Sequence, residues 1–294
     1  MKLFKTKKSI ISVCKLLAFI ILLNSLSAVF CIKAAGKMDD SKLHAICACL
    51  YDATNERVLY SKNGDEVRAM ANTTKIMTCI LALEYGNLDD IVTVSKYAAS
   101  MPDVQLNAKE NEQYRLGDLL YSLMLESHND VAVIIAEHIS GSVLEFSKLM
   151  NDKARDLCCF DTYFITPNGL DGSINKDGKT LKHSTTATDL AKIMAYCIKN
   201  PKFLEITTTK SYTFNTKKNA FLDMMEGVIS GKTGFTGDAG YCYVCAFKKD
   251  GKTFVVTLLG CGWPNNKTYK WQDSKYLLNY GLDNYESKTI NEKN

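Results

Sequence analysis

The chain has 294 residues, of which 46% are hydrophobic and 23% charged, a composition that provides a large apolar core and excludes a mostly disordered protein. The formal charge of +4 comes from residues 1–35, which hold six lysines and no acidic residue. The remainder has 30 basic and 32 acidic residues and no basic stripe with interleaved aromatics, so nucleic acid is excluded as a partner.

The N-terminal segment predicts export. Its lysine-rich start precedes an apolar run from Leu16 to Cys31 with small residues near the end, the pattern of a secretory signal. Residues 1–35 are therefore interpreted as a signal peptide cut after Ala28 or Ala35. Because no clear cleavage motif is present, an uncleaved anchor is the alternative, although a membrane span needs about 20 apolar residues. Both interpretations predict an exported protein at the outer face of the cytoplasmic membrane or in the cell wall.

The hydrophobic periodicity then predicts strands at both ends of the chain and helices between them. We expect a hairpin over residues 45–60 and later strands over Ser211–Phe214, Ala239–Lys248 and Lys252–Leu259. The expected helices cover Thr73–Leu83, Leu116–Met124, Val131–His138, Phe146–Leu157, Thr188–Lys199 and Ser274–Gly281. Residues 166–182 are expected to form a loop because they contain Pro167 and several glycines. This order predicts an α+β fold in which one sheet combines both chain ends and a helical lobe covers it.

The eleven cysteines would normally suggest disulfides in an exported protein. However, their spacing does not match a disulfide framework or a zinc site. The single CxxC, Cys242 to Cys245, lies in a predicted strand, where its two side chains face opposite sides of the sheet. Most of the cysteines are therefore predicted to act as small buried hydrophobic residues.

Three short motifs occur in a specific order. They are Asn72-Thr73-Thr74-Lys75, Ser127-His128-Asn129 and Lys232-Thr233-Gly234. Together they resemble the S-x-x-K, S-x-N and K-T-G set of penicillin-binding proteins and serine β-lactamases. The flanking residues 71–78, 166–171, 183–187 and 231–241 resemble the low-molecular-mass D-alanyl-D-alanine carboxypeptidases of serine peptidase family S11. The likeness extends from about Ala45 to Gly281.

This resemblance implies a fold and an activity. The fold is that of serine β-lactamases and DD-peptidases, with a five-stranded antiparallel sheet flanked by helices plus an all-helical lobe. We expect it in residues 36–285, followed by a polar tail over residues 286–294. The implied activity removes the terminal D-alanine from peptidoglycan stem peptides through a serine acyl-enzyme, with no metal or cofactor. No room remains for a further C-terminal domain, so membrane attachment is expected only through the N-terminus.

The motifs suggest a role for each candidate residue. Positions i and i+3 share a helix face, so residue 72 lies beside Lys75, which as a neutral amine would be the general base. Two lysines in one cleft also lower each other's pKa. Ser127 and Asn129 are expected on a loop between helices, with Ser127 as the candidate proton relay. By resemblance, the backbone N–H groups at residues 72 and 235 form an oxyanion hole. The predicted substrate-binding residues are Asn129, Lys232, Thr233, Gly234 and Phe235, with Gly234 admitting the substrate to the strand edge.

The sequence departs from the family at Asn72, where the nucleophilic serine is expected. An amide has no ionisable proton for Lys75 to remove, and Thr73, Thr74 and Thr78 are not placed to replace the serine. Asparagine is instead expected here as a helix N-cap. His128 is a second departure, and it is expected to narrow the cleft.

Two functions remain open. One is a carboxypeptidase that is either weakly active by an unusual route or an altered version of an active parent. The other is a catalytically silent homologue that binds muropeptides or regulates an active relative, with β-lactams as non-covalent ligands. β-Lactamase activity is disfavoured because no deacylating glutamate can be placed.

Overall fold

The computed structural model describes residues 36, 38–210, 212 and 224–286. The predicted signal or anchor, nearly all of the polar tail, and most of the strand expected over Ser211–Phe214 lie outside these residues. The main body extends from Asp39 to Asp283. Within the described ranges, no helix is both long and apolar enough to cross a membrane.

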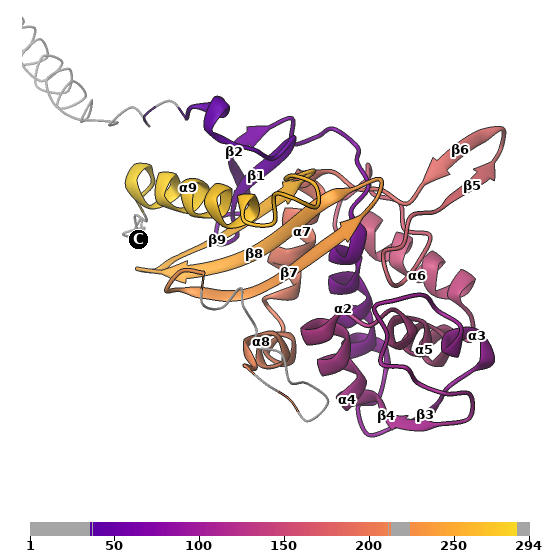
Figure 1. The fold of residues 1–294 in the computed structure, drawn as a ribbon. Coiled ribbons are helices and arrows are strands. Elements are labelled where there is room, and N and C mark those ends of the chain that lie inside the picture. The colour runs from indigo at the N-terminus through magenta and orange to yellow at the C-terminus, as the bar shows by residue number, and fades with distance from the viewer. Residues whose placement is uncertain (1–35, 37, 211, 213–223, 287–294) are drawn as a thin grey trace, which may run out of the picture. The chain divides into compact units, whose positions relative to one another are not determined.

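The core of the body is a five-stranded antiparallel sheet built from both ends of the chain. Its strand order is β2-β1-β9-β8-β7, so β7 forms one edge (Figure 1). The predicted N-terminal hairpin and both later strands are confirmed, as is the antiparallel α+β plan. The bounds are β1 Cys47–Asp52, β2 Arg57–Lys62, β7 Val228–Thr236, β8 Gly240–Lys249 and β9 Lys252–Leu259.

Helices cover both faces of this sheet, which explains why β8 is buried along most of its length. Helix α9 (Tyr269–Asn284) lies on one face, where Trp271 packs edge-on against Tyr243 at 4.9 Å. Helix α7 (Ala187–Cys197) packs against β1, β8 and β9 on the opposite face (Figure 1). A short 3₁₀ helix, η1 (Asp40–Lys42), precedes β1.

A helical lobe lies beside the sheet (Figure 1). Its apolar side chains belong to the same continuous core as the face of the sheet that α7 covers. Each helix predicted from periodicity is present, with ends shifted by a few residues. The elements are η2 Ala71–Thr74, α2 Lys75–Tyr85, β3 Ile91–Thr93, α3 Lys96–Ala99, β4 Gln113–Arg115, α4 Leu116–Tyr121, the π-helical turn η3 Ser122–Glu126, α5 Asn129–Ser140 and α6 Val143–Asp156.

Besides the short elements β3, α3 and β4 of the lobe, two parts of the fold were absent from the sequence-based prediction. The expected loop over residues 166–182 contains a hairpin, β5 (Ser173–Lys176) and β6 (Lys179–Lys182), which projects from the body (Figure 1). Its residues are mostly exposed, so they lack the alternating apolar pattern that marks a half-buried strand. Helix α8 (Pro201–Thr208) was also missed. Its start was readable, because Asn200 caps it and Pro201 is the first helical residue.

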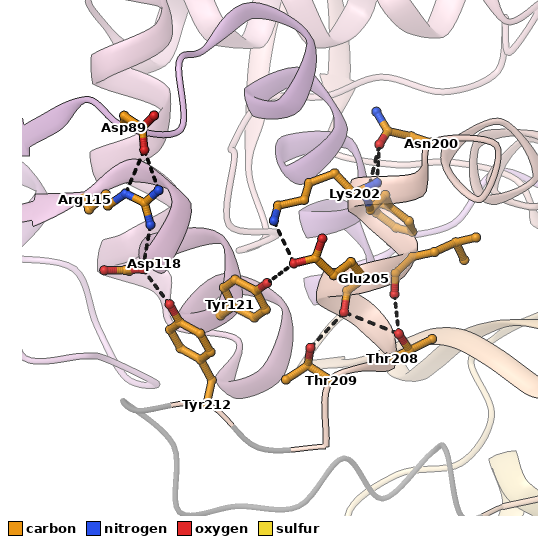
Figure 2. Close-up of polar contacts among 12 residues, drawn as sticks. Asp89, Arg115, Asp118, Tyr121, Asn200, Lys202, Glu205, Thr208, Thr209 and Tyr212 are labelled. Carbon is orange, nitrogen blue, oxygen red and sulfur yellow. Dashed lines mark hydrogen bonds and ion pairs between the residues drawn. The ribbon is translucent and has the colours of Figure 1, made fainter.

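Polar contacts join α8 to the helical lobe, as Figure 2 shows. Tyr121 of α4 donates to Glu205 of α8 at 2.8 Å, and Lys202 of α8 pairs with the same carboxylate at 2.7 Å. Tyr212, which follows α8, donates to Asp118 at 2.6 Å and stacks on Tyr121 with ring centroids 4.0 Å apart. These contacts fix α8 between β7 and the lobe.

The cysteine prediction is confirmed for the part of the chain that the structure describes. Its nine cysteines are all free, and all except Cys158 are buried. Cys242 and Cys245 are both fully buried in β8. Cys242 contacts the carbonyl of Ala69, whereas Cys245 shares a strand face with Tyr243, which packs on α9. The CxxC pair is therefore divided between the two faces of the sheet.

Candidate active site

The fold brings the three motifs together from distant parts of the chain. Residue 72 lies in η2 at the start of α2, Ser127 precedes α5, and Lys232 is in β7. Lys75 and Lys232 are almost completely buried, at 0% and 3% exposure. Ser127 and Thr233 are half-buried and Phe235 is exposed. Two buried lysines thus lie close to partly exposed side chains that come from both the sheet and the helical lobe.

Lys75 is surrounded by oxygen atoms that can only accept hydrogen bonds. Its Nζ donates to Asn72 Oδ1 at 3.0 Å, to Asn129 Oδ1 at 2.8 Å and to the Asn168 carbonyl at 2.6 Å. An ammonium has three N–H donors, whereas a neutral amine has two donors and one acceptor. This set of contacts is therefore complete only for the charged lysine.

Burial opposes that charge. It lowers the pKa of Lys75 well below its usual value, and the nearby charge of Lys232 lowers it further. The expected direction of the shift is thus confirmed, but burial is a larger cause than the second lysine. Asn72 supplies an acceptor at the point where acyl transfer needs a hydroxyl that can give up its proton.

Ser127 contacts the other lysine. Lys232 Nζ donates to Ser127 Oγ at 2.8 Å and to the Thr233 carbonyl at 2.9 Å. Burial lowers the pKa of Lys232 to about 7. Ser127 adopts a left-handed backbone conformation, with φ of 69°, which turns the chain between η3 and α5. The predicted relay serine is therefore next to the lysine of the third motif.

Asn129 was predicted to lie on a loop but is the first residue of α5. Its side-chain nitrogen donates to the carbonyls of Pro102 and Asp103 at 3.1 and 3.0 Å, while its oxygen accepts from Lys75. The amide therefore connects Lys75 to the backbone of residues 102–103, which explains why both an acceptor and a donor are needed here.

The prediction that Asn72 caps the helix was wrong. The 3₁₀ turn η2 begins at Ala71, so residue 72 lies inside it, and the cap position, Met70, makes no side-chain capping bond. Ala71 has a φ of 49°, an uncommon left-handed conformation for a residue with a Cβ. The Asn72 side chain is free to point at Lys75 because the turn, rather than a cap, starts the helix.

Gly234 was predicted to admit a substrate to the strand edge. In the structure it admits the backbone of η2 instead. A Cβ at this position would lie 2.6 Å from the backbone nitrogen of Asn72. The glycine is therefore needed because η2 packs directly on β7. This packing brings the backbone of Asn72 next to Gly234, the residue before Phe235, as an oxyanion hole would require.

Sequence reasoning missed the network that supports η2. Ile165 N–H donates to His183 Nδ1 at 2.9 Å, so the Nε2 of His183 carries the proton and donates to Thr74 Oγ1 at 2.7 Å. Thr74 Oγ1 donates in turn to the Ala71 carbonyl at 2.8 Å. Burial lowers the pKa of His183 to about 3, which keeps this imidazole neutral. Only the position of His183 in a family-like segment hinted at this role.

The remaining hydroxyls on η2 and α2 are occupied. Thr73 Oγ1 donates to the Met70 carbonyl at 2.6 Å, and Thr78 Oγ1 donates to the Pro167 carbonyl at 2.6 Å. Both hydroxyls therefore donate to backbone carbonyls, in agreement with the expectation that these threonines are not placed to replace the serine.

His128 is buried, with Nδ1 at 2.8 Å from Ser122 Oγ in η3. This contact directs the ring into the helical lobe, so the prediction that it narrows the cleft was wrong. In the ranges that the structure describes, no group of His, Cys, Asp and Glu residues could hold a metal ion.

Comparison with known proteins gives one consistent family. The family model of peptidase S11, D-alanyl-D-alanine carboxypeptidase, matches residues 33–261. D-alanyl-D-alanine carboxypeptidase DacF of Bacillus subtilis is 32% identical over 279 residues, which cover 89% of this chain and 68% of that protein.

Solved structures agree with this result. A D-alanyl-D-alanine carboxypeptidase from Mycobacterium tuberculosis superposes with a TM-score of 0.75 at 27% identity, covering 85% of this chain and 95% of that one. Penicillin-binding protein D2 from Listeria monocytogenes, in its ampicillin-bound form, superposes with a TM-score of 0.69 at 27% identity, covering 82% and 98%.

Proposed function

Because this chain belongs to the peptidase S11 family of D-alanyl-D-alanine carboxypeptidases, we propose that its cleft binds peptides ending in D-Ala-D-Ala without forming an acyl-enzyme at residue 72. The observation that carries this proposal is the contact between Lys75 Nζ and Asn72 Oδ1 at 3.0 Å. A serine acyl-enzyme begins with transfer of a hydroxyl proton to a base. Here the base meets an oxygen that has no proton to give.

Binding of a peptide does not require the nucleophile that catalysis needs. Lys232 and Thr233 offer a cation and a hydroxyl to the C-terminal carboxylate, and β7 is a sheet edge along which a peptide can pair. The N–H groups of Asn72 and Phe235 are suited to the carbonyl of the penultimate residue. The same contacts would hold a β-lactam without covalent attachment. The ampicillin-bound form of the Listeria monocytogenes relative supports this extension. In this proposal the protein is a silent muropeptide-binding or regulatory homologue.

One observation favours a second candidate, a weakly active carboxypeptidase. Ser127 Oγ lies 2.8 Å from Lys232 Nζ, and burial lowers the pKa of this lysine to about 7. A neutral Lys232 could accept the Ser127 proton. That route would remove the cation which the substrate carboxylate needs, so the two roles of Lys232 compete. This competition is why binding is the first proposal.

We further propose that the protein is exported and acts outside the cytoplasmic membrane. The lysine-led apolar segment at the N-terminus supports export. Attachment, if residues 1–35 are retained, would be through this segment.

Calorimetric titration of the native chain tests binding. We expect a peptide ending in D-Ala-D-Ala to bind and its L-Ala-L-Ala counterpart not to bind. Lys232→Ala should abolish binding because it removes the carboxylate partner, while the exposed lysine substitution Lys249→Ala in β8 serves as the matched control. Equal binding of both stereoisomers would contradict the proposed recognition.

A further inference from the structure

Lys75 and Asn72 form a pair in which an amine faces a carboxamide. Lys75 Nζ lies 3.0 Å from Asn72 Oδ1, with Asn72 in η2 and Lys75 at the start of α2. Lys75 is completely buried, so its amine is shielded from bulk water. The flexible four-carbon stem of a lysine lets Nζ move from the amide oxygen to the carbon that bears it. The pair therefore holds a nucleophile beside an acyl carbon that carries a leaving nitrogen.

Lys75 meets both conditions that activate a lysine as a nucleophile, which are desolvation and a second cation nearby. Burial and the charge of Lys232 both lower the pKa of Lys75, whereas the charge of Asp130 opposes this shift. The charged amine satisfies the three oxygen contacts of Lys75, but the attacking form is the neutral one. Because the ammonia that the attack releases diffuses away, a small neutral fraction is sufficient for the product to accumulate.

Of the two side-chain amides that contact Lys75, Asn72 is the better placed to react. Asn129 Oδ1 is also close, at 2.8 Å, but its Nδ2 is held by the carbonyls of Pro102 and Asp103. Within the described ranges, Nδ2 of Asn72 has no such hydrogen bond, and Asn72 is half-buried rather than buried. Its nitrogen can therefore leave towards solvent, whereas that of Asn129 must first break two hydrogen bonds.

We propose that Lys75 and Asn72 join in an intramolecular isopeptide bond. Lys75 Nζ attacks Asn72 Cγ, a C–N bond forms, and the bond from Cγ to Nδ2 breaks. The proton that Nζ gives up moves to Nδ2, which leaves as ammonia with the bonding electron pair. One amine and one carboxamide thus give one secondary amide and one ammonia, with no oxidant or other co-reactant. The cation of Lys232, whose charge acts at Lys75, stabilises the negative charge that develops on Oδ1 during the attack.

Proximity explains why an ordinarily unreactive amide reacts here. Well-oriented groups held in contact can react as though one were present at about 10⁵–10⁸ M. A serine at residue 72 offers no acyl carbon, so the bond is specific to the departure from the family. The bond removes the charge of Lys75 but leaves Lys232, Thr233 and the backbone N–H of residue 72 unchanged. This inference therefore goes beyond the proposed peptide binding and does not depend on it.

Mass spectrometry of the purified native chain tests the bond. The intact, denatured chain should be lighter than its sequence by one ammonia. Trypsin cleaves after a lysine only when the ε-amine is free, so cleavage after Lys75 should be lost. The peptide from Ala69 to Lys96 should then appear with the same mass deficit, and fragmentation should place the deficit within residues 72–75.

Variants distinguish the bond from other losses of ammonia. Asn72→Ala and Lys75→Arg should each have the full mass of their sequences, and Asn72→Ala should regain cleavage after Lys75. A native chain that keeps its full mass after days of incubation would overturn the proposal. A deficit with normal cleavage after Lys75 would indicate a cyclic imide at an asparagine and would also overturn it. A deficit that persists in Asn72→Ala but is lost in Asn129→Ala would overturn the assignment to Asn72. Peptide binding plays no part in these measurements, so failure of the bond and failure of the proposed recognition are told apart.

Discussion

Replacing Asn72 by serine should restore acyl transfer. In the native chain, Lys75 Nζ contacts three oxygens that only accept, and the charged amine satisfies all of them. Asn72→Ser exchanges one of these acceptors for a hydroxyl. A neutral Lys75 could then donate to Asn129 Oδ1 and to the Asn168 carbonyl while accepting the hydroxyl proton, so its three contacts fit the base form. Burial already favours that form, because it lowers the pKa of Lys75.

The effect should be large on rate and small on stability. Loss of a nucleophile commonly costs about four to six orders of magnitude in rate, so a restored hydroxyl should turn an undetectable reaction into a clear one. The exchange alters one hydrogen bond, worth about 1 kcal/mol, so the melting temperature should change by a few degrees at most. Labelling with a fluorescent penicillin and release of D-alanine from a pentapeptide measure the gain.

Three results would refute this reasoning. Asn72→Ala should stay silent, because it removes the amide without adding a hydroxyl, and Asn72→Ser combined with Lys75→Ala should stay silent because the base is missing. Labelling of either variant would contradict the assigned roles. If the native chain already labels with penicillin, the nucleophile must be a residue other than Asn72. Mass mapping would then show whether that residue is Ser127. An Asn72→Ser variant that binds penicillin non-covalently but never acylates would show that residue 72 is not the only broken part.

Three further predictions concern other parts of the chain. In an expressing cell, the protein should fractionate with the envelope or the medium, and its N-terminus should map between residues 29 and 37 if cleaved. Recovery of the full-length chain from the cytoplasm would contradict export. Stability should decrease as the pH falls from 6.5, the ordinary pKa of histidine, towards 3, the pKa of His183 in the folded state, because the unfolded chain takes up the proton first. The loss is about 5 kcal/mol at most, and denaturant titrations of His183→Gln should show a flatter pH dependence. Gly234→Ala should abolish peptide binding, because its Cβ would lie 2.6 Å from the nitrogen of Asn72, whereas the exposed Gly178→Ala in the β5–β6 turn should leave binding intact.

The sequence by itself determined much of the fold. The apolar spacing of α2, α5, α6 and α7 and the β-branched runs of β8 and β9 are local patterns, and each is decided by which face of an element is buried. The order of the three motifs, together with their flanks, indicated the family. The departure at Asn72 was likewise evident, because a missing hydroxyl is a property of the residue alone.

Elements without such a local pattern could not be predicted. The β5–β6 hairpin is exposed on both faces, so no alternation marks it. Asn200 and Pro201 do mark the start of α8, but that helix has only eight residues, and its contact with Tyr121 comes from a residue far away in the chain. Asn129 was assigned to a loop because the polar residues beside it resemble a break, although they begin α5.

Only the tertiary structure decided what the site residues contact. Asn72 faces Lys75 as an acceptor because η2 begins one residue earlier, at a left-handed Ala71, and packs on Gly234 of a strand more than 150 residues away. His183 reaches Thr74 across 109 residues of sequence. Spacing along a helix constrains neighbours three or four residues apart, whereas the protonation of a buried lysine depends on every donor and acceptor that the folded chain brings around it.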